Sequence, residues 1–521
     1  MKLNLKDRFN KQLAADKNLN NTRRQVMEAC FSFVQPLSPC NPQLLHVSKE
    51  MLNNIGLSDA DASSKEFLDI FSGTKTLDNS NPYSMCYGGH QFGHWAGQLG
   101  DGRAINLAEV EHNNKIWVLQ LKGAGPTPYS RSADGFAVLR SSIREHLCSE
   151  AMHHLGVPST RSLSLVLSGD QVMRDMMYDG NAAYEKGAIV CRVAPSFIRF
   201  GNFEIFSARK DIKNLKSLAD YTIRHHFPDI KTEGKSAYIE FFKEVSELSL
   251  KMVVDWQRVG FVHGVMNTDN MSILGLTIDY GPYGWLEPYD TNWTPNTTDK
   301  TNKRYRFGNQ PSVVLWNLFQ LANALYPLVE ETKPFEKILD NYKKNFSNQY
   351  VEMMRSKLGF VEEEQQDIVI IESLLENLEK SETDYIIFFR QLSEINLQDG
   401  QTAALTKVQK SFYDENKIAD QVKKDWLVWF EKYLDRLNLE TQSDEERREV
   451  MNSVNPKYVL RNYMAQLAID AAEQKDYSII EELYKLLKQP YAEQIKQEKW
   501  YAKRPEWART KVGCSMLSCS S

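Results

Sequence analysis

The stretch His263-Gly-Val-Met-Asn-Thr-Asp-Asn-Met-Ser-Ile-Leu-Gly-Leu-Thr-Ile-Asp-Tyr-Gly281 holds the densest group of polar residues in the chain. It follows the apolar dipeptide Phe261-Val262, which comes directly after a long amphipathic segment. Asp269, Asn270 and Asp279 carry oxygen ligands of the kind that Mg²⁺ prefers in proteins. The stretch therefore predicts a metal site. The alternative is a buried loop whose carboxylates cap backbone groups.

The spacing within this stretch matches the catalytic loop of protein kinases in part. In kinases the loop reads H-R-D-x-x-x-x-N, and a following D-F-G supplies another magnesium ligand. Here Asn270 stands seven residues after His263, and Asp279-Tyr-Gly281 corresponds to the D-F-G. The match fails at the catalytic base, because the residue two positions after the histidine is Val265, which cannot accept a proton. Asp269 is the only carboxylate nearby, so an ordinary protein kinase is disfavoured.

Upstream of this stretch the sequence predicts mostly strands. Apolar runs on either side of the polar turn His112-Asn-Asn114 indicate a β-hairpin. A second hairpin is expected around Ser168-Gly-Asp170, where polar residues interrupt another apolar run. The expected strands span residues 103–110, 116–121, 163–167, 171–174 and 188–193.

Helices are predicted between these strands and after them. The first is expected to be capped by Asp134 and to end at Gly156. The second runs from Tyr238 to Val259, with apolar residues on one stripe. Beyond about residue 309 the pattern is helical and amphipathic to the end. Strands with one helix followed by a helical half predict a two-lobed α+β protein rather than an alternating βαβ fold.

Basic residues upstream form a second candidate constellation. Lys122 ends a predicted strand, and Glu145 lies on the helix that follows. Such a pair can present the lysine ammonium group to nucleotide phosphates, as in protein kinases. Arg103, Arg192 and Arg199 are suited to binding phosphate oxygens bidentately. Unrelated surface side chains are the alternative for each of these residues.

Length and charge limit the classes of function. The chain has 521 residues, with 63 Lys and Arg against 68 Asp and Glu and a net charge of −5. Roughly 150 residues per domain gives about three structural units. The acidic balance provides no general footprint for nucleic acid or anionic membrane. No stretch reaches the roughly 18 uninterrupted apolar residues of a membrane helix, since Asn317, Gln320 and Asn323 interrupt the best candidate, residues 315–329.

The N-terminal residues, the cysteines and the histidines bear on the cellular compartment and on whether the chain binds zinc. The N-terminal residues 1–8 lack an apolar targeting region, and the seven scattered cysteines form no disulfide framework. We therefore expect a cytoplasmic monomer with reduced thiols. His90 and His94 have the spacing of zinc ligands on a helix, but the glycines among residues 87–102 disfavour a helix there, and with it zinc.

Together these motifs resemble those of the selenoprotein O family, from about residue 40 to the C-terminus. Members of that family are pseudokinases that bind ATP in a flipped orientation and transfer AMP, rather than phosphate, to protein hydroxyls. The segments that carry the resemblance are Tyr87-Gly-Gly-His-Gln-Phe-Gly93, Gln98-Leu-Gly-Asp-Gly-Arg103, Leu121-Lys-Gly-Ala-Gly-Pro-Thr-Pro-Tyr-Ser-Arg131, His263-Gly-Val-Met-Asn-Thr-Asp-Asn270, Ile278-Asp-Tyr-Gly-Pro-Tyr-Gly284 and Ser518-Cys-Ser-Ser521.

The resemblance implies a role for each candidate residue. Asp269 would accept the proton of a Ser, Thr or Tyr hydroxyl, and Asn270 and Asp279 would hold Mg²⁺, or Mn²⁺ in its place. Glu145 would be the partner of Lys122. The ATP contacts implied are Gly100, Gly102, Arg103, Lys122, Asp134, Gly135, Arg192, Arg199 and Asp279. Phosphoryl transfer, UMP transfer from UTP and a catalytically dead nucleotide-binding scaffold remain as alternatives. Val265 counts against the first, and the complete set of metal ligands counts against the last.

The family's fold divides the chain into four expected parts. These are an N-terminal extension (1–80), a kinase-like N-lobe that binds the nucleotide (81–205), the catalytic part of a C-lobe (206–335) and a helical C-terminal region with a cysteine-containing tail (336–521). Cys519 occupies the position where eukaryotic members can carry selenocysteine. Family members have been linked to redox control through a disulfide between this tail and the loop after the metal site. That loop, residues 290–299, has no cysteine here, so such a switch needs Cys514 or another partner, and an inert thiol is the alternative.

Overall fold

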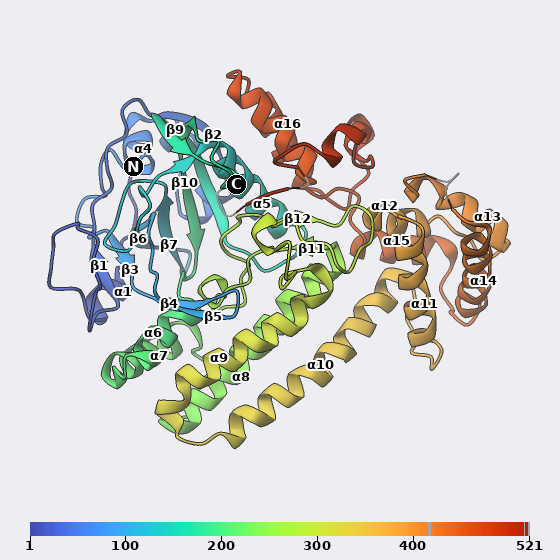
Figure 1. The fold of residues 1–521 in the computed structure, drawn as a ribbon, viewed down its shortest axis with the longest axis horizontal. Coiled ribbons are helices and arrows are strands. Elements are labelled where there is room, and N and C mark those ends of the chain that lie inside the picture. The colour runs from blue at the N-terminus through green and yellow to red at the C-terminus, as the bar shows by residue number, and fades with distance from the viewer. Residues whose placement is uncertain (415–417, 515, 519–521) are drawn as a thin grey trace.

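The computed structural model describes residues 1–414, 418–514 and 516–518, and it is a mixed α+β structure (Figure 1). An antiparallel sheet has the strand order β1-β3-β6-β7-β10-β9-β2, with β8 paired to β10 beside this path. Its strands are β1 (Phe31–Phe33), β2 (Gln43–Val47), β3 (Tyr83–Met85), β6 (Ala104–His112), β7 (Lys115–Lys122), β8 (Ala137–Val138), β9 (Arg161–Arg174) and β10 (Ala183–Ala194). The α+β prediction is confirmed.

The hairpin of β6 and β7 is confirmed, and it determines where Lys122 lies. Asn113 and Asn114 both have positive φ values, 49° and 59°. This is the conformation of a type I′ turn, whose twist matches that of the flanking strands. The pairing continues to Ala104 and Lys122, so the lysine is the last residue of β7.

The expected turn at Ser168-Gly-Asp170 is wrong. Residues 161–174 form one continuous strand, β9, along β10. The register between the two strands shifts between Lys186 and Ala188, opposite Gly169, whose φ is +84°. A bulge therefore absorbs the polar residues without reversing the chain.

The helix after β8 is confirmed, but its predicted cap is wrong. This helix, α5 (Leu139–His154), begins directly after Ala137 and Val138, which pair with β10 instead of forming a helical turn. Asp134 forms a two-pronged ion pair with Arg174 of β9, with N–O distances of 2.6 and 2.8 Å. Pairing with the sheet thus delays the start of α5 and leaves Asp134 on the loop before it.

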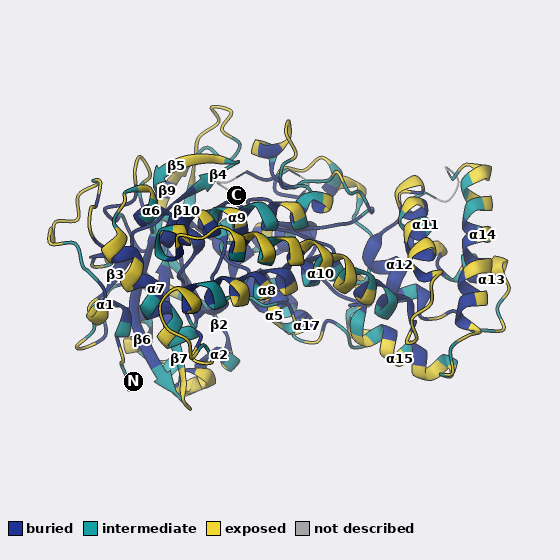
Figure 2. Ribbon diagram, turned by 90° about the horizontal axis from the view of Figure 1, so that it is seen from below, coloured by how far each residue is buried: buried dark blue, intermediate teal, exposed yellow. Residues whose placement is uncertain are grey.

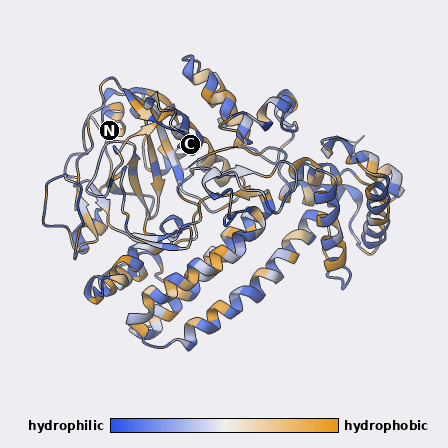
Figure 3. Ribbon diagram, viewed as in Figure 1, coloured by the Kyte–Doolittle hydropathy of each residue, from blue (hydrophilic) through white to orange (hydrophobic). Residues whose placement is uncertain are grey.

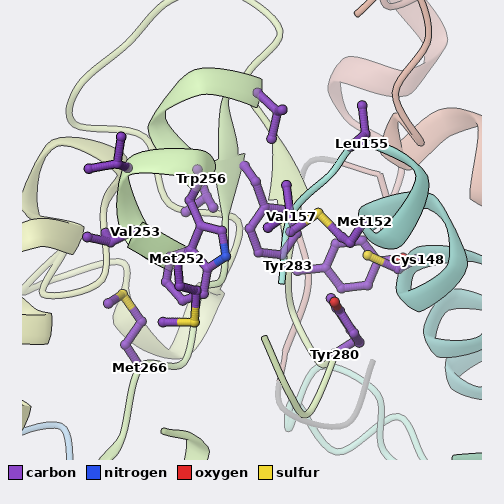
Figure 4. Close-up of a cluster of buried hydrophobic side chains, with 14 of the residues drawn as sticks. Cys148, Met152, Leu155, Val157, Met252, Val253, Trp256, Met266, Tyr280 and Tyr283 are labelled. Atoms are coloured by element: carbon purple, nitrogen blue, oxygen red, sulfur yellow. The ribbon is translucent and has the colours of Figure 1, made fainter. Parts of the chain in front are cut away.

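A buried cluster joins α5 to the long helix α8 (Lys235–Val259), which is confirmed and ends at Gly260 with φ +70°. Figure 4 shows Trp256 of α8 on one side of this cluster and Cys148 of α5 on the other, with Tyr283 between them. Trp256 also donates from Nε1 to Thr277 Oγ1 at 2.8 Å. The segment 277–283 is therefore held between α5 and α8 by packing and hydrogen bonding.

The second half of the chain is helical, as predicted. The helices that follow α8 are α9 (Gln310–Val329), α10 (Lys333–Leu358), α11 (Asp367–Lys380), α12 (Tyr385–Leu392), α13 (Gln401–Lys407), α14 (Asp420–Leu437), α15 (Asp444–Val454), α16 (Asn462–Glu473) and α17 (Ser478–Leu487). Helices α11 to α15 gather at the end of the molecule away from the sheet (Figure 1), whereas α17 returns to pack against α5. Smaller helices are α1 (Arg8–Gln12), α2 (Lys49–Asn54), α3 (Asp59–Ala62), α4 (Lys65–Phe71), α6 (Phe200–Ala208) and α7 (Ile212–His226).

Helix α9 is more apolar than the sequence pattern suggested. The helical stretch Phe307–Val329 is long and apolar enough, by length and composition alone, to cross a membrane, with a mean hydropathy of 1.3. Half of that window is buried inside the protein, and the amide of the buried Asn317 donates to Met266 O at 2.9 Å. These contacts are those of a core helix, although one face of α9 stays exposed (Figure 2).

Candidate functional site

One cavity of about 730 Å³ lies between the sheet and the segment 263–282. Residues from β7, β10, the glycine-rich loop before β6 and the loop before β8 line it. It brings together every residue predicted to contact a nucleotide or a metal: Gly100, Gly102, Arg103, Lys122, Asp134, Gly135, Arg192, Arg199, Asp269, Asn270 and Asp279.

A buried ion-pair network forms one wall of this cavity. Lys122 Nζ lies 2.5 Å from Glu145 Oε2, and Arg192 lies 3.2 Å from the other oxygen of the same carboxylate. Arg192 also donates from Nε to Gln120 Oε1 at 2.9 Å, across the pairing of β7 and β10. Burial lowers the pKa of Lys122, and the carboxylate of Glu145 opposes this effect. The predicted pairing of Lys122 with Glu145 is confirmed.

Asp279 is held between two arginines. Arg199 lies 2.5 Å from its Oδ2, and Arg192 contacts its Oδ1. Burial alone would raise the pKa of Asp279, but the charges of Arg199 and Arg192 outweigh it and keep this pKa well below the usual range. The backbone of Asp279 is also left-handed, with φ +57°. Asp279 is therefore an anion at neutral pH, with both oxygens directed at cations.

Asp269 has the opposite electrostatic environment. It lies in the 3₁₀ helix η1 (Thr268–Asn270), and only 8% of the residue is exposed. Burial raises its pKa to about 7, although Arg199 lowers it in part. Gln91 donates to Oδ2 at 3.3 Å, whereas Oδ1 has no hydrogen-bond partner in the described residues. A carboxylate with a pKa near neutrality and a free oxygen is suited to accept a proton.

The loop that carries Asp269 is fixed at both ends by His263. The ring of His263 is buried, and its Nε2 lies 2.8 Å from Ile278 O. Its Nδ1 accepts from Val265 N at 3.3 Å, which makes Nε2 the protonated nitrogen and the donor. Asn270 donates from Nδ2 to Val265 O at 2.9 Å. His263 thus positions the loop, and it is not among the residues that line the cavity.

The donor atoms near Asp269 fit a magnesium ion. The amide oxygen of Asn270 is not used by the hydrogen bond that its nitrogen donates, and both Asn270 and Asp279 line the cavity. This amide oxygen and the carboxylate of Asp279 are oxygen donors, which a hard cation such as Mg²⁺ prefers over nitrogen or sulfur.

The glycine-rich loop approaches its neighbours too closely for a side chain. A Cβ at Gly100, where φ is +81°, would lie 2.4 Å from the ring of Tyr129. A Cβ at Gly135, where φ is +87°, would lie 2.2 Å from Pro126 N. These glycines keep the backbone tight around the cavity. The guanidinium of Arg103, at the end of the glycine-rich loop, has no ion pair within 4 Å and no side-chain hydrogen bond in the described part of the chain, although its charge helps to lower the pKa of Asp134.

Several residues of the site were missed by sequence reasoning. Gln91 lies in the segment 87–93 that resembles the family, yet only its contact with Asp269 shows what it does. Gln120 is an ordinary polar residue in the middle of a strand, and nothing in its pattern marks it as the partner of Arg192. Tyr178 reaches the cavity from the connection between β9 and β10, where no sequence signal points to a site.

The zinc hypothesis stays disfavoured. Strands β4 (Gly88–Gln91) and β5 (His94–Gln98) form a hairpin, so His90 and His94 do not share a helical turn. The Nδ1 of His90 contacts Glu204 at 2.5 Å. A separate group, Glu50, His153 and His154, has ligand atoms within 4.8 Å of one another, but Lys488 already lies 2.6 Å from Glu50.

The C-terminal tail packs against the loop that follows the predicted metal site. Thr297 N donates to Leu517 O at 2.7 Å, and Leu517 N donates to Pro295 O at 3.0 Å. Asn296, between them in the sequence, donates from Nδ2 to Gly264 O at 3.0 Å, which joins the tail to the catalytic loop. Cys514 is buried, and Cys519 lies outside the described residues.

Comparison with known proteins gives matches along almost the whole chain. A family model described as "Protein adenylyltransferase SelO" matches residues 15–488. The chain is 60% identical over 519 residues to "Protein nucleotidyltransferase YdiU" of Flavobacterium johnsoniae, covering 100% of this chain and 99% of that protein. It is 52% identical over 536 residues to the protein of the same description from Rhodopirellula baltica, covering 100% and 99% of the two chains.

Proposed function

This chain belongs to the SelO family, and from that premise we propose that it is a protein nucleotidyltransferase that transfers AMP from ATP to Ser, Thr or Tyr hydroxyls of proteins. The observation that carries the proposal is the set of side chains that line the 730 Å³ cavity. It combines six basic side chains, among them the predicted Arg103, Lys122, Arg192 and Arg199, with a carboxylate, Asp269, whose pKa is about 7. The cations suit a triphosphate, and the carboxylate suits a hydroxyl that must lose its proton.

The reaction is an in-line displacement at the α-phosphorus of ATP. The hydroxyl oxygen of the acceptor attacks this phosphorus, its proton passes to Asp269, and the bond from the α-phosphorus to the bridging oxygen breaks. Pyrophosphate leaves with the electron pair of that bond. Lys122 and the arginines offset the negative charge on the departing pyrophosphate, and this electrostatic stabilisation supplies much of the catalysis.

Magnesium, or manganese in its place, would be held by Asn270 and Asp279, and when bound it neutralises charge on phosphate oxygens and fixes their orientation. The arginines that hold Asp279 in this structure can turn to phosphate oxygens, because guanidinium groups bind phosphates as readily as carboxylates. We further infer that residues 81–205 and 206–335 act as the two lobes of a kinase-like body, with 1–80 and 336–521 as extensions.

Labelled ATP tests this function directly. With ATP labelled at the α-phosphate we expect label on acceptor proteins and an intact-mass gain equal to AMP; label from the γ-phosphate would indicate a kinase and contradict the proposal. UTP in parallel tests the choice of nucleotide, and EDTA tests the need for metal. Asp269→Ala should slow transfer by about 10²–10⁴-fold, the usual contribution of a general base.

Asp279→Ala should abolish transfer, because it removes a metal ligand and leaves Arg192 and Arg199 without their anion. Asp229→Ala is the matched control, since Asp229 is exposed and lies outside the cavity. Full activity of Asp279→Ala would contradict the metal assignment.

A further inference from the structure

One face of α9 presents aromatic side chains to solvent. Phe319 is 50% exposed and Tyr326 is 43% exposed, and Trp316 on the same face is half-buried. Phe319 lies three residues after Trp316, and Tyr326 lies seven residues after Phe319, so the three side chains form a single stripe along the helix. The opposite face is buried, and the helix from 310 to 329 contains no charged residue. Hydrophobic residues recur along α9 (Figure 3), and most of them belong to the buried face, whereas Phe319 and Tyr326 are exposed.

A basic loop precedes this stripe. Lys300, Lys303, Arg304 and Arg306 lie within seven residues, and none of them has a carboxylate within 4 Å of its charged group in the part of the chain that the structure describes. The nearest acid in sequence, Asp299, accepts hydrogen bonds from the backbone N–H groups of Arg304 and Tyr305. Asp299 interacts electrostatically with Arg304 and Arg306, but one carboxylate cannot balance four cations, so the loop presents an excess of positive charge.

The stripe and the loop meet beside the catalytic loop. The guanidinium of Arg304 stacks on the ring of Trp316 at 4.5 Å. Next to it, the hydroxyl of Tyr305 donates to Asn267 Oδ1 at 2.6 Å, two residues before the proposed base. The same hydroxyl accepts from Phe92 N at 2.9 Å, and the neighbouring Gln91 donates to Asp269. The basic loop and the stripe therefore meet where Arg304 stacks on Trp316, and the buried Tyr305 links this surface to the loop that carries Asp269.

We propose that this surface, formed by Lys300, Lys303, Arg304, Arg306, Trp316, Phe319 and Tyr326 and called the acceptor surface below, docks the protein that receives AMP. The proposal rests on the proposed function. The occupant is a segment of the acceptor protein that carries Asp or Glu near the modified hydroxyl and an apolar residue farther along. Charge complementarity selects the acidic residues, and the stripe selects the apolar one.

The position of the acceptor surface fits this role. A protein hydroxyl must reach Asp269 from outside, and Tyr305, the neighbour of Arg304 in the acceptor surface, bonds to Asn267, two residues before Asp269. Exposed aromatic side chains next to a cleft are typical of docking sites, because they bury much area at a small entropic cost. The neighbouring hairpin adds Trp95, which is 40% exposed and whose ring lies 5.2 Å from that of His90.

A peptide library tests this surface. Each peptide has a central Ser that is flanked either by Glu or by Lys residues. Each of the two types is made with and without a Phe toward one end, and all are incubated with α-labelled ATP and Mg²⁺. We expect the acidic peptides with Phe to be labelled at least about tenfold more efficiently than the basic ones. Lys300→Glu combined with Lys303→Glu should raise KM for the acidic peptides and reduce or reverse the preference, with kcat and ATP affinity unchanged.

Phe319→Ser should remove the advantage of the Phe-containing peptides alone. The matched controls lie on α14, far from the cavity: Lys423→Glu with Lys424→Glu for the charges, and Val428→Ser for the apolar side chain, which is 50% exposed. A library labelled without regard to charge, or not labelled at all, overturns the docking proposal, whereas the proposed function is judged by labelling of whole proteins. Two other results also overturn the docking proposal. One is a dimer, seen by light scattering, that Phe319→Ser dissociates; the other is binding to phosphatidylcholine vesicles that Phe319→Ser abolishes.

Discussion

Two aspartates only ten residues apart have opposite acidities, and this difference defines their roles. Asp279 faces Arg192 and Arg199 and stays ionised, whereas burial raises the pKa of Asp269 to about 7. Val265 occupies the place where a kinase has its base, so the proton must go elsewhere. We propose that Asp269 takes it, since one of its oxygens has no hydrogen-bond partner among the described residues.

The pH dependence of transfer follows from the pKa of Asp269. The base must be deprotonated, so kcat/KM should rise with pH and level off above about 7, the pKa of this carboxyl in the free protein. The measurement is initial rates between pH 5.5 and 8.5 with α-labelled ATP. In Asp269→Asn the residual rate should lose this rise, because the titrating group is gone. A wild-type profile that is flat across pH 7 would contradict the assignment of Asp269 as the base.

At the scale of elements, the pair Lys122 and Glu145 links strand β7 to helix α5. Glu145→Gln leaves Lys122 and Arg192 buried with one negative charge fewer, and breaking a buried ion pair in this way costs about 3–5 kcal/mol. We expect a lower melting temperature for this variant. ATP should raise that temperature more than it does in the wild type, because the triphosphate supplies the missing negative charge.

Thermal melts with and without ATP measure both effects. Glu185→Gln is the matched control, since Glu185 pairs with Arg140 at 2.9 Å but is not among the residues lining the cavity. Equal ATP shifts in Glu145→Gln and in the wild type would show that the cations of this network do not face the nucleotide.

An element could be predicted when the residues that determine it are close together in the sequence. The hairpin at Asn113 and Asn114 follows from residues that tolerate positive φ, and α8 from its apolar stripe and its final glycine. Ser168-Gly-Asp170 has the same composition as a turn, but pairing along β10 turns it into a bulge. Asp134 is a residue type that often caps helices, but its carboxylate pairs instead with Arg174, forty residues away in sequence.

The site was predictable to the extent that its residues stand in recognisable motifs. Lys122, Asp269 and Asp279 could be identified because their spacing matches a known arrangement. Gln120 could not, because its contact with Arg192 depends on the register of two strands. The acceptor surface depends on exposure, and an apolar residue such as Phe319 looks the same in a sequence whether it faces the core or solvent.

At the scale of the whole molecule, the C-terminal helix α17 packs on the N-terminal sheet. Tyr484 donates to Ser48 Oγ at 2.9 Å, and Ser48 donates to Glu150 of α5. The Nε2 of His46, in β2, lies 2.9 Å from Oε2 of Glu481 in α17. Residues more than 430 positions apart in sequence are thus joined by one buried and one partly buried polar contact.

This contact should couple the unfolding of the two ends of the chain. Tyr484→Ala removes a buried ring and a hydrogen bond, at a cost of about 3 kcal/mol or more. We expect hydrogen exchange to accelerate in β2 and β9 as well as in α17, measured by mass spectrometry. Tyr184→Ala, at a residue 68% exposed, is the control. Faster exchange confined to α17 would show that the sheet is stable without it.

The pairing of Leu517 with Thr297 sets the moment in synthesis at which the site is completed. Translation proceeds from the N-terminus, so Thr297 leaves the ribosome well before Leu517 does. Until then, the segment that holds Gly264 of the catalytic loop through Asn296 lacks its neighbour. A nascent chain from which Leu517 has not yet emerged therefore has an unfinished wall beside the loop that carries Asp269.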